Sequence, residues 1–267
     1  MADTLHFERY EYKYFVPDDR TEELRRFIRP YTQLDEHAAR AADRRYSIHS
    51  VYFDTQKLDL YHASVDDQVD RYKLRVRWYD DAVAGPYFGE VKRKVRQVIV
   101  KDRVRLAPSE AAALLQQRAA TGMGSRARLD RRAHAGVVGF EDRVVQIGAV
   151  PTVCVRYTRE AYESVFGEYA RITFDRAMCW QRIDGTGWSL QPRAWSYVDS
   201  APAMQGIRDA MLIELKFTRR FPRWMADLVA EFDLERRGFS KFVWSMSRQL
   251  ATTQDDTLLQ RVAGIGA

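Results

Sequence analysis

Cysteine is scarce in this sequence, with two residues among 267. Neither lies in a CxxC pair, and no His/Cys cluster has the spacing of zinc ligands. The first twenty residues lack the apolar core of a signal peptide, and no run of 18 apolar residues occurs. The glycine-rich phosphate cradles GxxxxGK[ST] and GxGxxG are absent as well. These absences predict a cytoplasmic protein in a reducing compartment, without a zinc centre or a transmembrane segment.

Positive charge is in excess. The 43 Lys and Arg residues against 37 Asp and Glu residues give a formal net charge of +6. That excess favours an anionic partner, but it does not choose among nucleic acid, phosphorylated metabolites and acidic lipids. With 46% hydrophobic residues the chain is typical of a folded protein. We expect one domain over residues 7–250, followed by a weakly ordered tail over residues 251–267.

Several segments alternate between apolar and polar residues with the period of two that is typical of strands. The expected strands cover residues 6–16, 46–54, 71–79, 87–94, 98–106, 152–164, 169–176 and 211–217, with a further hairpin over 178–191. Helices are expected over residues 21–28, 58–64, 108–118, 222–232 and 239–250. Residues 33–45 read as a loop or frayed helix.

The polar face of the strand over residues 71–79 is almost purely cationic, with Lys73, Arg75 and Arg77 on one side. Two structures would produce such a pattern: a half-exposed sheet with a basic outer face, or a closed tunnel with the cations inside. Like charges this close repel unless an anion lies between them, and the arginine fork suits phosphate oxygens. A barrel of about eight strands has room for side chains or one small ligand. The sequence therefore predicts an α+β protein with a closed eight-stranded antiparallel β-tunnel and helices packed outside.

Three glutamates, Glu11, Glu90 and Glu214, share faces with these cations. They are either charge partners of the arginines and lysines or ligands of Mg²⁺ or Mn²⁺, hard ions that prefer oxygen and bridge phosphates. Phosphoryl transfer needs little covalent help from a protein, because positioning and charge stabilisation suffice. Both roles of the glutamates stay open at this point.

Nine short motifs occur in one order along the chain: Arg9-Tyr-Glu-Tyr-Lys13, Val51-Tyr-Phe-Asp-Thr55, Arg71-Tyr-Lys-Leu-Arg-Val-Arg77, Glu90-Val-Lys92, Lys101-Asp-Arg103, Arg156-Tyr-Thr-Arg159, Arg171-Ile-Thr-Phe-Asp175, Glu214-Leu-Lys216 and Ser240-Lys241-Phe242. Together they resemble the VTC (vacuolar transporter chaperone) domain of polyphosphate polymerases, a branch of the triphosphate tunnel metalloenzymes. The resemblance spans residues 7–248. It implies a tunnel of eight strands in which the γ-phosphate of ATP is moved onto a growing polyphosphate chain with Mn²⁺ or Mg²⁺.

The resemblance also implies roles for single residues. Phosphates of the nucleotide would contact Lys13, Arg75, Arg77, Lys92, Arg159 and Lys241. Further contacts to the nucleotide or along the path of the chain would come from Tyr157, Lys101, Arg103, Arg171 and Ser240. The metal would be held by Glu214, with Glu11 and Glu90 as further candidates. Because side chains alternate along a strand, Tyr157 and Arg159 share a face, and Arg156 points outward unless a bulge intervenes.

One departure from the related hydrolytic enzymes is informative. They open with ExExK, whereas Arg9 replaces the first glutamate of that motif here. Losing one carboxylate argues for the polymerase branch over a tunnel triphosphatase, which remains an alternative. A module that binds polyphosphate or a nucleotide without catalysis is a second alternative. Nucleic acid is disfavoured, because cations between carboxylates differ from an exposed groove with stacking aromatics. Association with a membrane partner stays open.

Overall fold

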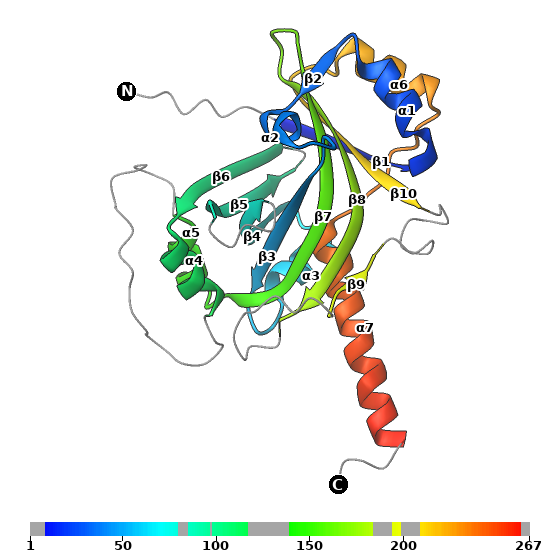
Figure 1. Ribbon diagram of the computed structural model, residues 1–267. Coiled ribbons are helices and arrows are strands. Elements are labelled where there is room, and N and C mark those ends of the chain that lie inside the picture. The colour runs from blue at the N-terminus through cyan, green and yellow to red at the C-terminus, as the bar shows by residue number, and fades with distance from the viewer. Residues whose placement is uncertain are drawn as a thin grey trace, which may run out of the picture.

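The computed structural model of the protein describes residues 9–79, 85–96, 98–116, 139–183, 194–198 and 209–262. Ten strands of these residues form one antiparallel sheet, in the order β2-β7-β3-β4-β5-β6-β1-β10-β8-β9. The strands are β1 (Arg9–Pro17), β2 (Thr32–Leu34), β3 (Tyr46–Asp54), β4 (Asp70–Tyr79), β5 (Tyr87–Val95), β6 (Val98–Leu106), β7 (Val150–Ser164), β8 (Ala170–Arg182), β9 (Ser196–Tyr197) and β10 (Ala210–Thr218). Strand β7 also pairs with β8, so the sheet curls back on itself (Figure 1).

The expected closed eight-stranded tunnel is confirmed only as a large antiparallel sheet. Ten strands are present because the short β2 and β9 add to β7 and β8, where they pair with residues 162–164 and 179–180. Between β6 and β1 the register contains a single pair, Arg9 with Ile99, whereas β1 and β10 pair from Arg9 to Pro17. The seam between β6 and β1 is therefore not the regular ladder of a closed barrel.

Helices cover the sheet from outside and at one end. They are α1 (Thr21–Ile28), α2 (Glu36–Arg40), α3 (Asp59–Val65), α4 (Pro108–Leu115), α5 (Phe140–Gln146), α6 (Arg223–Glu231) and α7 (Lys241–Val262), with a 3₁₀ turn at Asp18–Arg20. Residues 33–45, expected as a loop or frayed helix, contain the end of β2 and helix α2. Helix α7 continues past Leu250, where we expected the last helix to end. The second half of the hairpin expected over 178–191 lies largely outside the described residues.

Two apolar clusters join the outer helices to the sheet. Helices α1 and α6 pack on β1, β8 and β10 through residues such as Leu24 and Leu228. Helices α4 and α5 pack on the outer face of β3, β4 and β5, on the other side of the molecule in Figure 1. Glycine is required at position 89 of β5, because a Cβ there would lie 2.8 Å from a ring carbon of Phe140. The close approach of α5 depends on that missing side chain.

A third apolar cluster lies on the inner face of the sheet, against the first turns of α7. Phe242 and Met246 of the helix pack with Tyr52 of β3 and Leu212 of β10, and all four side chains are buried. The rings of Tyr52 and Phe242 stack with centroids 4.9 Å apart. Part of the interior is therefore filled by apolar side chains, and the polar side chains of the same strands are confined to the rest.

No helix among the described residues has both the length and the apolar character needed to cross a bilayer.

Candidate active site on the inner face of the sheet

Alternation along the strands places the predicted site residues on the same inner face. The residues that the structure brings together there are Glu11, Lys13, Arg75, Arg77, Glu90, Lys92, Lys101, Arg103, Tyr157, Arg159, Glu214, Ser240 and Lys241. They come from β1, β4, β5, β6, β7 and β10 and from the start of α7. The expectation that Tyr157 and Arg159 share a face agrees with their contacts. Arg156 lies over the ring of Trp195 at 4.5 Å, next to a bulge in the β7–β8 ladder.

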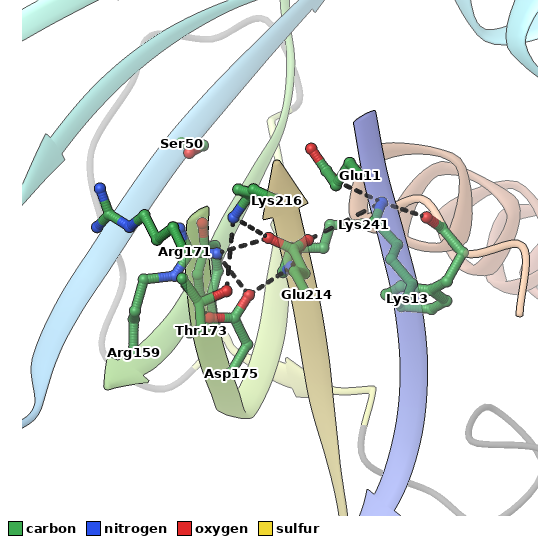
Figure 2. A network of polar contacts seen from close by, with 12 residues as sticks. Glu11, Lys13, Ser50, Arg159, Arg171, Thr173, Asp175, Glu214, Lys216 and Lys241 are labelled. Carbon is green, nitrogen blue, oxygen red and sulfur yellow. Dashed lines mark hydrogen bonds and ion pairs between the residues drawn. The ribbon is translucent and has the colours of Figure 1, made fainter. Parts of the chain in front are cut away.

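The first group of contacts, the Glu214 cluster, comprises Lys13, Arg159, Asp175, Glu214, Lys216 and Lys241 (Figure 2). Glu214 Oε2 accepts from Arg159 Nη2 at 3.0 Å and from Lys216 Nζ at 2.7 Å, and its Oε1 accepts from Lys241 Nζ at 3.1 Å. Asp175 forms ion pairs with Arg159 and Lys241: its Oδ1 lies 2.6 Å from Arg159 Nε, and its Oδ2 lies 2.6 Å from Lys241 Nζ. Two buried carboxylates thus hold four cations in fixed positions.

The second group, the Glu90 cluster, comprises Arg75, Arg77, Glu90, Lys101 and Arg103. The carboxylate of Glu90 is fully buried and contacts Arg75 at 2.6 Å, Lys101 at 2.7 Å and Arg103 at 2.6 Å. Arg77 lies farther away, at 3.9 Å. One carboxylate faces four cations here, so positive charge is in larger excess than in the Glu214 cluster.

Tyr157 connects the two clusters. Its hydroxyl accepts from Arg77 Nη2 at 3.2 Å, and the second hydrogen bond of Arg77 goes from Nε to Ser50 Oγ at 3.2 Å. The Tyr157 ring lies 4.6 Å from the ammonium of Lys241 and 5.2 Å from the guanidinium carbon of Arg159. Among the described residues, Arg77 is thus a buried cation whose hydrogen bonds go to neutral hydroxyls.

A third set of contacts joins lysines of β1, β4 and β5 to Glu11 and to the residues just before α7. The ammonium of Lys73 donates to Ser240 Oγ at 2.7 Å. Lys92 donates to Glu11 Oε2 at 2.9 Å, and Lys13 donates to the backbone oxygen of Phe239 at 2.7 Å. Among the described residues no carboxylate lies within ion-pair distance of Lys73. An external anion bound beside Lys73 would therefore supply the negative charge that its described neighbours do not provide.

Burial and charge oppose each other in the carboxylates. Burial alone would raise the pKa of Glu11, Glu90 and Glu214, yet the surrounding lysines and arginines hold all three pKa values well below the ordinary one. All three side chains are therefore ionised at neutral pH.

Burial and the nearby cations lower the pKa values of several lysines on the inner face. Burial and neighbouring cations hold the pKa of Lys73 and Lys101 well below the ordinary value, although Glu90 acts against this at Lys101. Burial lowers the pKa of Lys216 to about 8, against the opposing effect of Glu214. A lysine with such a lowered pKa loses its proton easily. A bound anion would raise the pKa again and favour the protonated form.

Some residues of these clusters were not among the predicted site residues, and one predicted residue, Arg171, stands opposite Lys216 but pairs with carboxylates outside the clusters. Lys216 shares the face of Glu214 by alternation along β10, which the sequence shows, whereas Asp175 is brought to the site by the register that sets it opposite Arg159 of β7. Arg171 pairs with Asp35 and lies 3.3 Å from Glu163, at the edge of the inner face where β2 ends and α2 begins. Its role as a contact along the path of a chain stays a prediction.

The carboxylates can be tested for their fit to a divalent ion. No group of three Asp, Glu, His or Cys side chains among the described residues is arranged to hold a metal alone. Glu11 and Glu214 do converge, since the ammonium of Lys13 lies 3.1 Å from Glu11 Oε1 and 3.9 Å from Glu214 Oε1. Mg²⁺ commonly takes one or two carboxylates and completes its shell with phosphate oxygens and water. Glu11 and Glu214 fit such an ion, whereas the contacts of Glu90 are those of a counter-ion.

A family model described as the VTC domain matches residues 8–249 of the chain. No protein with a curated description matches it. Among solved structures it resembles a candidate adenylyl cyclase from Hippeastrum described as having a dominant triphosphatase activity, with a TM-score of 0.48, 18% identity, and coverage of 90% of this chain and 95% of that one. A candidate adenylate cyclase from Bacillus halodurans gives a TM-score of 0.47, 14% identity, and coverage of 88% and 94%.

Binding of an anion on the inner face is expected to take up protons. The pKa of Lys216 is about 8 without ligand, and a bound tripolyphosphate would raise it toward the ordinary 10.5. Between these pH values binding therefore adds a proton, and affinity falls as pH rises. Calorimetric titration at pH 9 in buffers of different ionisation enthalpy measures the uptake. Lys216→Met should reduce it, and a binding enthalpy that is the same in all buffers would contradict the expectation.

Proposed function

The chain belongs to the VTC domain family, and from that membership and its inner face we propose that it is a metal-dependent polyphosphate polymerase. In this proposal it transfers the γ-phosphate of ATP onto a growing polyphosphate chain. The observation that carries the proposal is the excess of cations over carboxylates on the inner face, where one buried glutamate faces four cations in the Glu90 cluster and no described carboxylate pairs with Lys73. Such an excess is costly without a ligand and favours a polyanion.

The course of the strands supports a tunnel as the container of this reaction. The pairings run through β7, β3, β4, β5, β6, β1, β10 and β8 and return to β7. We propose that these eight strands form the wall of the tunnel and that β2 and β9 extend it at the edges. The cations on the inner face would then surround a chain of phosphates. This arrangement argues against nucleic acid, which needs an open basic groove.

The proposed step needs no nucleophilic side chain. A terminal oxygen of the acceptor chain attacks the γ-phosphorus of ATP, a new P–O bond forms, and the bond to the β-phosphate oxygen breaks so that ADP leaves. Arg77 and Arg159 would bind phosphate oxygens, and Lys241 would hold the chain beside Glu214. A Mn²⁺ or Mg²⁺ ion held by Glu11 and Glu214 would neutralise charge on the phosphates. The scarcity of cysteine agrees with a cytoplasmic location.

The decisive test is the identity of the product. Purified protein with ATP and Mn²⁺ is expected to form a polymer that runs as a ladder on a polyacrylamide gel and is degraded by an exopolyphosphatase. ADP should appear in proportion to the phosphate incorporated. Orthophosphate as the main product would establish the tunnel triphosphatase instead. Binding of ATP without turnover, with Mn²⁺ or with Mg²⁺, would establish a binding module.

Arg77→Met is expected to lower kcat/KM by about a hundredfold or more, the loss typical of a buried group that stabilises developing charge. The melting temperature without ligand should stay the same or rise, because burial and repulsion by Arg75 oppose the charge of Arg77, which Glu90 and Tyr157 favour, and its hydrogen bonds go to the hydroxyls of Ser50 and Tyr157. Arg93→Met is the matched control, since Arg93 of β5 pairs with Asp70 on the outside. A large loss of stability in Arg77→Met with normal kinetics would contradict the assignment.

Glu11→Gln is expected to raise the Mn²⁺ concentration at half-maximal activity by about tenfold or more, as loss of a ligand or its close support does. Glu214→Gln should abolish turnover, since Glu214 would serve the ion and also orders three cations of its cluster. Titration of free Mn²⁺ by electron paramagnetic resonance measures binding directly. Glu23→Gln, on the outer helix α1, is the control. Unchanged metal dependence in both inner variants would exclude these two carboxylates as ligands.

A further inference from the structure

Glu90 is the most enclosed carboxylate of the inner face. Its side chain has no exposed surface, whereas those of Glu11 and Glu214 are 10% and 7% exposed. In the register of the sheet it stands directly between Arg75 of β4 and Arg103 of β6. Both arginines can therefore turn toward it without a change in the backbone.

The oxygens of Glu90 occupy the donors that a phosphate would use. Oε2 contacts Arg75 through Nε at 2.7 Å and through Nη2 at 2.6 Å. Oε1 contacts Arg103 through Nε at 2.7 Å and through Nη2 at 2.6 Å. Each arginine presents to Glu90 the two-nitrogen edge with which guanidinium groups bind carboxylates and phosphates. The same edges cannot bind a phosphate oxygen while Glu90 holds them.

Lys101 completes the arrangement. Its ammonium lies 2.7 Å from Glu90 Oε1, the oxygen that also contacts Arg103. Because Arg77, at 3.9 Å, is the fourth cation around this one carboxylate, the cluster keeps an excess of positive charge while Glu90 is ionised. Glu90 therefore neutralises this part of the inner face only in part, which leaves it able to attract an anion.

We propose that Glu90 is a built-in counter-ion that competes with bound phosphates for Arg75, Lys101 and Arg103 and so weakens the binding of the chain at this place. The inference rests on the proposed function, because it takes the competing ligand to be a polyphosphate-type anion. In a polymerase, this competition would help the product chain to leave the site. A chain must move on after each transfer, and a carboxylate that takes the arginines back lowers the affinity that would hold the product in place.

The test is the affinity of Glu90→Gln for tripolyphosphate, measured by calorimetry without metal at low ionic strength. Glutamine keeps the shape and removes the charge, so the dissociation constant is expected to fall at least about tenfold, equal to about 1.4 kcal/mol. Without ligand the variant should melt at a lower temperature than wild type, because four cations then lack their counter-ion. Saturating tripolyphosphate should reduce that difference in melting temperature.

Glu160→Gln is the matched control. Glu160 of β7 is also fully buried and is also held by arginines, Arg25 and Arg176, but it lies on the outer face beneath α1. This variant should lose stability while its dissociation constant for tripolyphosphate stays within about twofold of wild type. If Glu90→Gln does not fold, Glu90→Asp is the second variant. It keeps the charge on a shorter side chain, so it should bind tripolyphosphate more tightly than wild type but less tightly than Glu90→Gln would.

Binding by the Glu90 variants that is equal to or weaker than wild type would overturn the inference and leave the proposed function standing. It would mean that Glu90 positions the arginines for the ligand or holds the metal. Failure of tripolyphosphate to bind wild type would instead remove the anion site itself, and with it both proposals. The two failures are thus distinguished by the wild-type titration alone.

Discussion

Repulsion among buried cations is the constraint on which the rest of this structure depends. Removing a charge from water costs several kcal/mol, and like charges in a low-dielectric interior add to that cost. The protein offsets it with carboxylates that each serve several cations, as Glu90 and Glu214 do. The offset is incomplete, because Lys73 has no described carboxylate as a partner and the pKa of Lys216 falls to about 8. The outer helices and the first turns of α7 pack on the strands and hold them against this repulsion.

A comparison with the outer face shows that the imbalance is specific to the interior. At α1, the carboxylates of Glu160, Asp18 and Glu22 face the two arginines Arg25 and Arg176, so this network has no surplus of positive charge. That network joins the helix to β7 and β8 and needs no further partner. The inner clusters also pair carboxylates with arginines around a fully buried glutamate, but they contain more cations than carboxylates. The difference in charge balance separates structural ion pairs from a site for an anion.

The two faces of the strands were predictable from the sequence, because the period of two assigns every second residue to the same side. Glu11 with Lys13, and Arg75 with Arg77, follow from that rule alone. The rule says nothing about register between strands, so the position of Asp175 beside Arg159 and Lys241 could not be found this way. Strands of two or three residues, such as β2 and β9, are too short to show a period. The single pair between β6 and β1 depends on how far these two strands are displaced along each other. They are distant in the sequence, so no local pattern predicts this displacement.

Helix α7 links the apolar and the polar halves of the interior. Its first residue, Lys241, reaches Glu214 and Asp175, and the next residue, Phe242, packs on Tyr52 within the inner apolar cluster. An apolar wall beside a charged cluster lowers the local dielectric and strengthens every interaction in that cluster. A water-filled interior would screen the same cations and reduce their pull on a phosphate. The packing of α7 against the strands is therefore part of the electrostatics of the site, and its apolar residues act on anion binding without touching the anion.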